Sequence, residues 1–330
     1  MRILITGGCG FLGSNLAAAA LRRGHEVIVI DAILRVGGQD NLAWLRSLGQ
    51  VPHYPIDVAD ATSVSELVRL LCPQVVFHLA GQVAMTTSIS DPRRDFATNA
   101  QGTFNVLEAV RAHAPDALVV YSSTNKVFGA LEQFTYRETE TRWECVERPN
   151  GFDESTPLSF HSPYGCSKGC ADQYMLDWHR MFGLKTVVFR HSSMYGGRQY
   201  ATEDQGWIGW FVRQAIAVAD NPDREPFSIS GNGKQVRDVL HAEDMVDLYF
   251  RAVDRAEAAA GKAFCIGGGM SNSLSLLELF AILEREVGVS LAYKRLPARS
   301  SDQRVFVADI SKAERILGWV PRIKVQDGLR

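Results

Sequence analysis

The sequence predicts an α/β protein with a doubly wound parallel sheet and a smaller, discontinuous C-terminal domain. Two observations support this. Short apolar runs alternate with helix-like segments through the first half of the 330 residues, and a glycine-rich turn joins the first run to the first helix. Strands that are apolar throughout are typical of a parallel sheet covered by helices on both faces. The chain is too long for one small domain, so we expect one large or two modest domains.

The elements of the first half follow from apolar runs and helical periodicity. The predicted strands lie at residues 2–6, 26–31, 75–79, 117–122 and 185–190. The predicted helices lie at residues 11–23, 63–71, 96–113 and 165–182. This order, strand then helix then strand, is that of repeated βαβ units.

The second half is less regular. Helices are predicted at residues 206–218, 242–256, 274–287 and 311–317, and short strands at 227–229, 236–240, 263–266 and 291–294. Ser311 and Glu314 have the spacing of a capping box, so they are expected to begin the last helix. The polar stretch 132–155 fits either a solvated surface loop or a flap beside the active site, because it directly follows a strand end.

Composition and charge exclude several classes of protein. Hydrophobic residues make up 46% and charged residues 22%, an ordinary globular balance. The net charge is −2, so the composition lacks the excess of positive charge that is typical of nucleic-acid-binding proteins. No apolar run approaches the ~20 residues that span a bilayer, and early glycines interrupt any signal peptide. The six cysteines form no Cys-x-x-Cys pair. They indicate reduced thiols in a cytoplasmic protein without a metal site.

Glycines at positions 7, 10 and 13 form a Gly-x-x-Gly-x-x-Gly turn between the first strand and the first helix. Such a turn lets a pyrophosphate approach the backbone, and the helix N-terminus favours its negative charge. Asp31 ends the second strand, where a carboxylate would bind ribose hydroxyls and repel a 2′-phosphate. These features predict a Rossmann domain that binds NAD in preference to NADP, although Arg35 weakens the argument for that preference slightly.

Tyr164 and Lys168 lie at i and i+4 on a predicted helix, so they share one face. An ammonium beside a phenol favours the phenolate, and we expect Lys168 to lower the pKa of Tyr164 from ~10. Thr124 follows the fifth strand, where its hydroxyl would point to the same place. The three residues predict proton transfer to or from a sugar hydroxyl.

With these motifs the chain resembles the extended short-chain dehydrogenases/reductases, in particular the sugar-nucleotide epimerases and dehydratases, over nearly its whole length. The resemblance implies NAD as cofactor and Thr124, Tyr164 and Lys168 as catalytic residues. It implies cofactor contacts from Gly7, Gly10, Phe11, Leu12, Gly13, Asp31, Asp57, Val58, Leu79, Ala80, Gly81, Asn99, Tyr164, Lys168 and His191. It implies substrate contacts from Gln82, Thr124, Asn125, Ser193, Arg198, Gln199, Arg237, Arg299 and Asp302.

Within that family, the segments 124–129, 161–168, 190–199 and 204–210, together with the insert at 132–155, resemble the branch that epimerises C2 of a CDP-sugar. The mechanism implied is transient oxidation to a 2-keto sugar. Dehydratases place an acid after the catalytic threonine, whereas this chain has Asn125 and Lys126, so dehydration is disfavoured. Epimerisation at C4, or at C2 of a UDP- or GDP-sugar, remains the alternative. A non-catalytic NAD-sensing or RNA-associated protein is disfavoured because Thr124, Tyr164 and Lys168 are all present.

The resemblance also suggests how the chain is divided and assembled. Residues 1–190, with about 236–268, are expected to form the NAD-binding domain. Residues 191–235 and 269–330 are expected to bind the nucleotide sugar. We expect a homodimer or homotetramer that pairs through the helices at 96–113 and 165–182.

Overall fold

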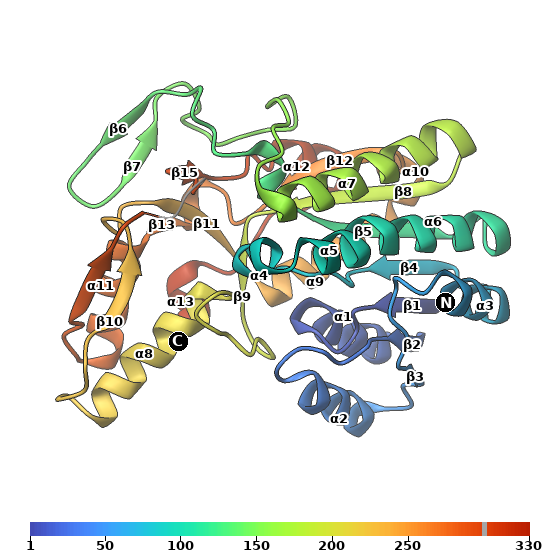
Figure 1. The fold of residues 1–330 in the computed structure, drawn as a ribbon, viewed down its shortest axis with the longest axis horizontal. Helices are drawn as coiled ribbons and strands as arrows, with labels where there is room; N and C mark the ends of the chain where they lie inside the picture. The colour runs from blue at the N-terminus through green and yellow to red at the C-terminus, as the bar shows by residue number, and fades with distance from the viewer. Residues whose placement is uncertain (299–301) are drawn as a thin grey trace.

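The computed structural model describes residues 1–298 and 302–330. Its main feature is a seven-stranded sheet with the order β12-β8-β5-β4-β1-β2-β3, in which every neighbouring pair is parallel. The strands are β1 (Arg2–Thr6), β2 (Glu26–Ile30), β3 (His53–Tyr54), β4 (Val75–His78), β5 (Leu118–Thr124), β8 (Lys185–His191) and β12 (Lys262–Ile266). The predicted fold class is confirmed (Figure 1).

Helices cover both faces of this sheet. One face packs against α1 (Phe11–Arg22), α2 (Gly38–Leu48), α9 (Ala242–Asp254), α10 (Ala256–Ala259) and α12 (Ser311–Leu317). The other packs against α3 (Ala61–Leu71), α6 (Gly102–His113) and α7 (Ser162–Phe182). Side chains alternate along each strand, so that Ile3 and Ile5 belong to one core and Leu4 to the other.

The helix predicted at 96–113 is interrupted. Helices α4 (Met85–Ser90) and α5 (Pro92–Phe96) come first, and a π-helical turn, η1 (Ala97–Gln101), joins α5 to α6. Such turns occur often at functional sites, and this one carries Asn99. Helix α2 was not predicted from the sequence, because it contains more polar residues than buried ones.

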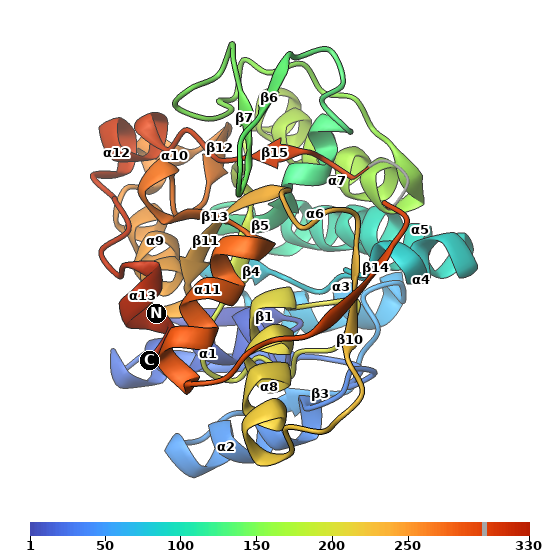
Figure 2. The same cartoon turned by 90° about the vertical axis from the view of Figure 1, so that its left-hand side faces the viewer.

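A second unit lies beside the carboxyl ends of the strands (Figures 1 and 2). Its small sheets join β9 (Ser193–Tyr195), β11 (Val236–His241), β13 (Ser273–Ser275) and β15 (Val305–Phe306), and separately β10 (Phe227–Ser230) and β14 (Tyr293–Leu296). Its helices are α8 (Trp207–Asp220), η3 (Met270–Asn272), α11 (Leu276–Val287) and α13 (Val325–Leu329). Strand β11 was expected within the NAD-binding domain, yet it pairs in a small sheet and not in the large one.

The polar stretch 132–155 is a docked hairpin. Strands β6 (Tyr136–Glu138) and β7 (Trp143–Cys145) pair antiparallel. The Trp143 N–H donates to the Lys234 carbonyl, and Arg142 forms an ion pair with Glu278. Among the described residues, none of this stretch lines the large pocket at the sheet edge. Many of its residues are exposed, as the alternative of a solvated surface segment predicts, but contacts with the second unit hold it as a hairpin.

The capping box is at a different helix from the one predicted. Ser311 donates to Asp309 and does not cap α12, whereas Ser275 and Glu278 form a complete capping box at α11.

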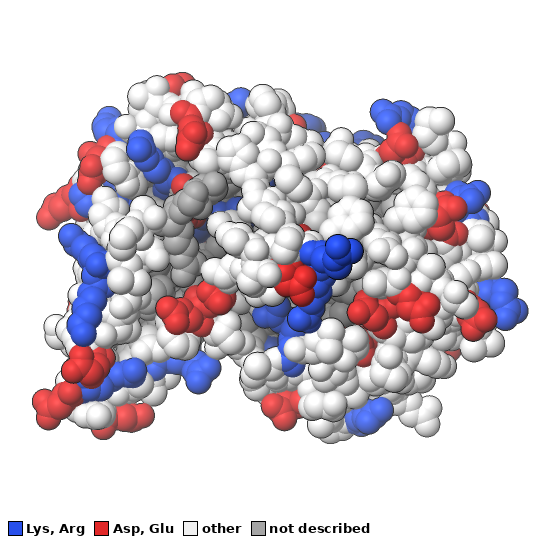
Figure 3. All heavy atoms as spheres, in the orientation of Figure 1, with Lys and Arg blue, Asp and Glu red and all other residues white. Residues whose placement is uncertain are grey.

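The described residues contain no helix long and apolar enough to cross a bilayer. Basic and acidic side chains are interspersed on the face shown in Figure 3.

Candidate active site

The glycine turn fits closely against the end of β4. Gly7 has a φ of +70°, and a Cβ added to it would lie 2.7 Å from the backbone nitrogen of Ala80. A Cβ on Gly13 would lie 2.2 Å from the Gly7 carbonyl oxygen. Gly10 begins α1 without a side-chain cap, so the N–H groups of the first turn remain available to a phosphate. The turn therefore fits a pyrophosphate for reasons of space and of charge.

The turn forms one wall of a pocket of about 430 Å³ at the carboxyl edge of the sheet. Fourteen of the predicted site residues line it: Gly7, Gly10, Phe11, Leu12, Gly13, Asp31, Asp57, Val58, Leu79, Ala80, Gly81, Gln82, Arg198 and Gln199. The opposite wall comes from the second unit and includes Met194, Tyr200 and Gln205. The sequence analysis missed these three residues, because no local pattern brings them to the glycine turn.

Asp31 lies at the end of β2 with its carboxylate oriented by backbone donors. One oxygen accepts from the Cys9 N–H at 2.8 Å, and the other accepts from the Ile33 N–H at 2.7 Å. The side chain remains partly exposed toward the pocket. A carboxylate in this place can accept further bonds from ribose hydroxyls.

Asn99 lies behind the pocket wall and does not line it. Its Oδ1 accepts from the Gln82 N–H at 2.9 Å, and its Nδ2 donates to the Gln82 carbonyl at 3.0 Å. The same amide donates to Ser167, whose hydroxyl bonds to the buried Asp95 at 2.5 Å. Burial raises the pKa of Asp95. This network joins η1, α5 and α7 to the loop after β4, and the sequence analysis did not identify its Asp95 and Ser167.

Tyr164 and Lys168 lie on α7 and face the end of β5, where Thr124 is its last residue. The Lys168 ammonium donates to the Ser122 carbonyl at 2.5 Å and lies 4.2 Å from the centre of the Tyr121 ring. Ser122 lines the large pocket, and a Cβ on Gly81 would lie 3.7 Å from the Lys168 nitrogen. Lys168 thus lies next to residues that line the pocket, without lining it itself.

The pKa values of this pair differ from the expectation. Burial raises the pKa of Tyr164 to about 12, and a hydrogen bond with Thr124 opposes the shift only in part. Burial lowers the pKa of Lys168 to about 7, against the attraction of Asp172 and Asp95. The prediction that Lys168 lowers the pKa of Tyr164 is therefore wrong for the protein alone. Removing both groups from water disfavours both charged forms.

His191 is level with Thr124 on the adjacent strand. Its Nε2 bonds to the Tyr249 hydroxyl at 3.0 Å, and the two rings are stacked. Burial, with Lys168 nearby, lowers its pKa to about 3, so the imidazole is neutral at physiological pH. Within the described residues its buried Nδ1 has no hydrogen-bond partner.

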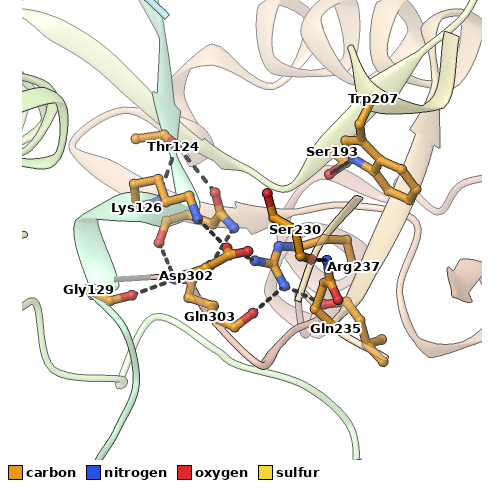
Figure 4. A network of polar contacts seen from close by, with 12 residues as sticks. Thr124, Lys126, Gly129, Ser193, Trp207, Ser230, Gln235, Arg237, Asp302 and Gln303 are labelled. Atoms are coloured by element: carbon orange, nitrogen blue, oxygen red, sulfur yellow. Dashed lines mark hydrogen bonds and ion pairs between the residues drawn. The ribbon is translucent and has the colours of Figure 1, made fainter. Parts of the chain in front are cut away.

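The predicted substrate residues of the second unit form a separate network (Figure 4). An Arg237 nitrogen lies 2.7 Å from an Asp302 carboxylate oxygen, and the Lys126 ammonium lies 3.5 Å from the same oxygen. Asn125 donates to the Gln303 side chain at 2.9 Å. The sequence analysis missed Gln303, although it is the next residue after Asp302, which was predicted.

Ser193, a further substrate candidate, bonds to a different partner. Ser193 accepts from the Trp207 indole at 2.9 Å. Arg299 lies outside the described residues. Thr124 connects to the network through Asn125, since the Thr124 hydroxyl donates to the Asn125 side chain at 3.3 Å and Asn125 donates to Gln303 at 2.9 Å.

The model of the NAD dependent epimerase/dehydratase family matches residues 3–267. The chain belongs to that family. It is 58% identical, over 330 residues, to the CDP-paratose 2-epimerase of Salmonella typhi, covering 100% of this chain and 97% of that protein. This confirms the resemblance to the C2 epimerases of CDP-sugars.

Two solved structures of the family are similar in fold. UDP-glucuronic acid 4-epimerase of Bacillus cereus, in complex with UDP-glucuronic acid and NAD, has a TM-score of 0.84 at 26% identity, covering 100% of this chain and 96% of that one. A dTDP-glucose 4,6-dehydratase of Streptomyces venezuelae with NAD bound has a TM-score of 0.82 at 27% identity, covering 100% and 94%. The predicted cofactor, NAD, is that of the family.

Proposed function

We propose that the chain epimerises C2 of a CDP-linked sugar, converting a CDP-paratose-type substrate into its CDP-tyvelose-type epimer. The observation that carries the proposal is the 58% identity, across the full chain, with a CDP-paratose 2-epimerase. The position of Thr124, Tyr164 and Lys168 next to the pocket that the glycine turn lines supports the redox route. The residue roles given below are part of the proposal.

C2 of the sugar is not acidic, so inversion needs a route other than direct deprotonation. Bound NAD would supply a hydride acceptor for C2 and then a hydride donor, so that no second substrate would be consumed. Tyr164 takes the hydroxyl proton as C2 becomes a ketone and gives it back once the sugar has turned in the pocket. Thr124 hydrogen-bonds the reacting oxygen, and Lys168 orients Tyr164 and holds the nicotinamide ribose.

The predicted site residues divide into two sets. The pocket residues from Gly7 to Gly81, with Asn99 and His191 behind them, would hold NAD. Arg237 and Asp302 would hold the substrate, and Arg237 suits its pyrophosphate because a guanidinium binds two oxygens at once. Asn125 and Lys126 occupy the place where a dehydratase carries acids, which favours epimerisation over loss of water.

A C4 epimerase, or a C2 epimerase of another nucleotide sugar, would share the same redox residues. The test is incubation with matched CDP-, GDP- and UDP-sugars, followed by chromatographic separation of the C2 and C4 epimers. We expect conversion at C2 of the CDP-sugar. Conversion at C4, or preference for UDP or GDP, would overturn the assignment.

We also propose a homo-oligomer that pairs through α6 and α7, and a cytoplasmic location. Phe104 on α6 and Tyr174 and Phe182 on α7 are large side chains left 38–51% exposed on this face. They pack around Trp178 as one aromatic cluster, which a second copy would cover. Light scattering at micromolar concentration should show at least a dimer, and a monomer would contradict this part.

A further inference from the structure

The segment of residues 196–205, here called the clasp, runs from the second unit across the pocket. It follows β9 and precedes α8. Five of its residues line the same pocket as the glycine turn: Arg198, Gln199, Tyr200, Thr202 and Gln205. The clasp therefore lies opposite the groups that would hold the pyrophosphate and the adenosine ribose.

Two buried or partly buried asparagines bind the clasp backbone to the NAD-binding region. Asn15, on α1, donates to the Gly197 carbonyl at 2.9 Å. Asn41, on α2 and only 2% exposed, donates to the Arg198 carbonyl at 3.3 Å and to the Cys9 carbonyl at 3.0 Å. The Asn41 amide thus connects the clasp directly to the glycine turn.

Two side chains of the clasp add contacts with the start and middle of α2. The Arg198 guanidinium lies 4.3 Å from the centre of the Trp44 ring. The Tyr200 ring packs against Gly37, where an added Cβ would lie 2.1 Å from the ring. Both contacts join the second unit to the segment that follows Asp31.

The other end of the clasp is fixed to the second unit. Arg213, on α8, donates to the Ala201 carbonyl at 3.0 Å, and the Gln199 amide donates to the Met194 carbonyl at 3.1 Å. Thr202 and Gln205 close a backbone turn with bonds of 2.8 and 3.2 Å. The segment is therefore anchored on both sides of the pocket.

We propose that the clasp retains the dinucleotide, with Arg198 and Tyr200 controlling its release. The inference rests on the proposed redox function, in which the cofactor ends each cycle as it began. Such an enzyme has no need to exchange NAD between turnovers. Contacts that close the pocket over the adenosine half slow dissociation without taking part in the chemistry at C2.

The test measures release of bound NAD. Holoenzyme is mixed with excess etheno-NAD, a fluorescent analogue, and the rate of exchange is followed for the wild type, Arg198→Ala and Tyr200→Ala. A cation–π contact between partly exposed groups predicts about a two- to fivefold faster exchange in Arg198→Ala. Arg46→Ala is the matched control, because Arg46 is an exposed arginine on α2 outside the pocket, and its exchange rate should equal that of the wild type.

A double-mutant cycle with Trp44→Ala checks that the contact itself matters. Arg198→Ala should accelerate exchange in the wild-type background but not in Trp44→Ala. Circular dichroism of each variant verifies folding, and Arg198→Lys, which keeps the charge, should show an intermediate exchange rate.

The outcomes separate the clasp from the proposed function. Exchange at the wild-type rate in both Arg198→Ala and Tyr200→Ala would overturn the clasp. An increase in KM for the CDP-sugar with unchanged NAD exchange would also overturn it and would support Arg198 as a substrate contact. A wild-type protein that binds no NAD at all would instead contradict the redox function.

Discussion

The Asp172 carboxylate on α7 and the Arg190 guanidinium on β8 form a bidentate ion pair inside the protein, with nitrogen–oxygen distances of 2.8 and 3.0 Å. The Ser123 hydroxyl on β5 donates to the same carboxylate at 2.7 Å. Asp172 lies one turn beyond Lys168, Ser123 precedes Thr124, and Arg190 precedes His191. One buried cluster thus fixes β5 and α7, which carry the proposed catalytic residues, and β8, which carries the cofactor candidate His191.

Asp172→Asn should destabilise the protein by about 3–5 kcal/mol, because it leaves the Arg190 charge buried without its carboxylate. The measurement is urea unfolding of the wild type and the variant. Arg111→Ala provides a surface comparison, since its ion pair with Glu108 is exposed to solvent and should contribute far less to stability. Equal losses in the two variants would show that burial of the Asp172 pair has no special energetic effect.

Tyr164→Phe removes one oxygen and keeps the ring, so folding and NAD binding should survive. General acid–base groups contribute roughly 10²–10⁴-fold, so kcat should fall by at least about 100-fold. Thr124→Val should lower kcat less, because it removes a hydrogen bond and leaves the proton acceptor. Steady-state kinetics with saturating CDP-sugar decide this, and a Tyr164→Phe enzyme with near-normal kcat would exclude Tyr164 as the base.

The lowered pKa of Lys168 gives the protein without cofactor a defined pH dependence. The folded state releases this proton at about pH 7, whereas the unfolded chain holds it to about pH 10.5. Between these values the unfolded state binds more protons, so Lys168 makes the free energy of unfolding rise with pH. Below pH 7 its charge is present in both states and its full burial cost applies.

Urea unfolding of the cofactor-free protein at pH 7 and pH 9 measures this contribution. The gain in stability from pH 7 to pH 9 should be larger in the wild type than in Lys168→Met, which lacks the titrating group. An identical gain in the two proteins would show that Lys168 keeps its ordinary pKa in the folded state.

A substrate carrying deuterium at C2 should keep its label in the epimerised product. In the proposed mechanism the same hydride leaves C2 and returns to it, and Tyr164 exchanges only the hydroxyl proton. Mass spectrometry of the product formed in ordinary water provides the measurement. Solvent hydrogen at C2 would instead indicate deprotonation or elimination.

Asp31 should determine the choice between NAD and NADP. Its carboxylate is held by the Cys9 and Ile33 N–H groups and lines the pocket, where it would repel a 2′-phosphate. Purified wild-type protein should carry NAD, measurable in the supernatant after denaturation. Asp31→Ser should raise the affinity for NADP relative to NAD, and mainly NADP in the wild-type protein would contradict this account.

The sequence by itself determined the fold class, six of the seven strands of the large sheet (all but β3) and the glycine turn. These features are visible as short-range patterns: apolar runs, glycine spacing and the i, i+4 relation of Tyr164 and Lys168. Each pattern predicts one local structure, respectively a strand, a turn and a shared helix face. The motifs also identified the family, because they occur in a fixed order along the chain.

Tertiary structure decided what depends on partners far apart in sequence. The Arg198 guanidinium lies over the Trp44 ring, Asn41 donates to the Arg198 carbonyl, and the Trp143 N–H donates to the Lys234 carbonyl. No local sequence pattern specifies these contacts. The pKa of Tyr164 was misjudged for the same reason. A neighbouring ammonium can be seen in the sequence, but the loss of solvent around both groups arises only when α7 packs against β5.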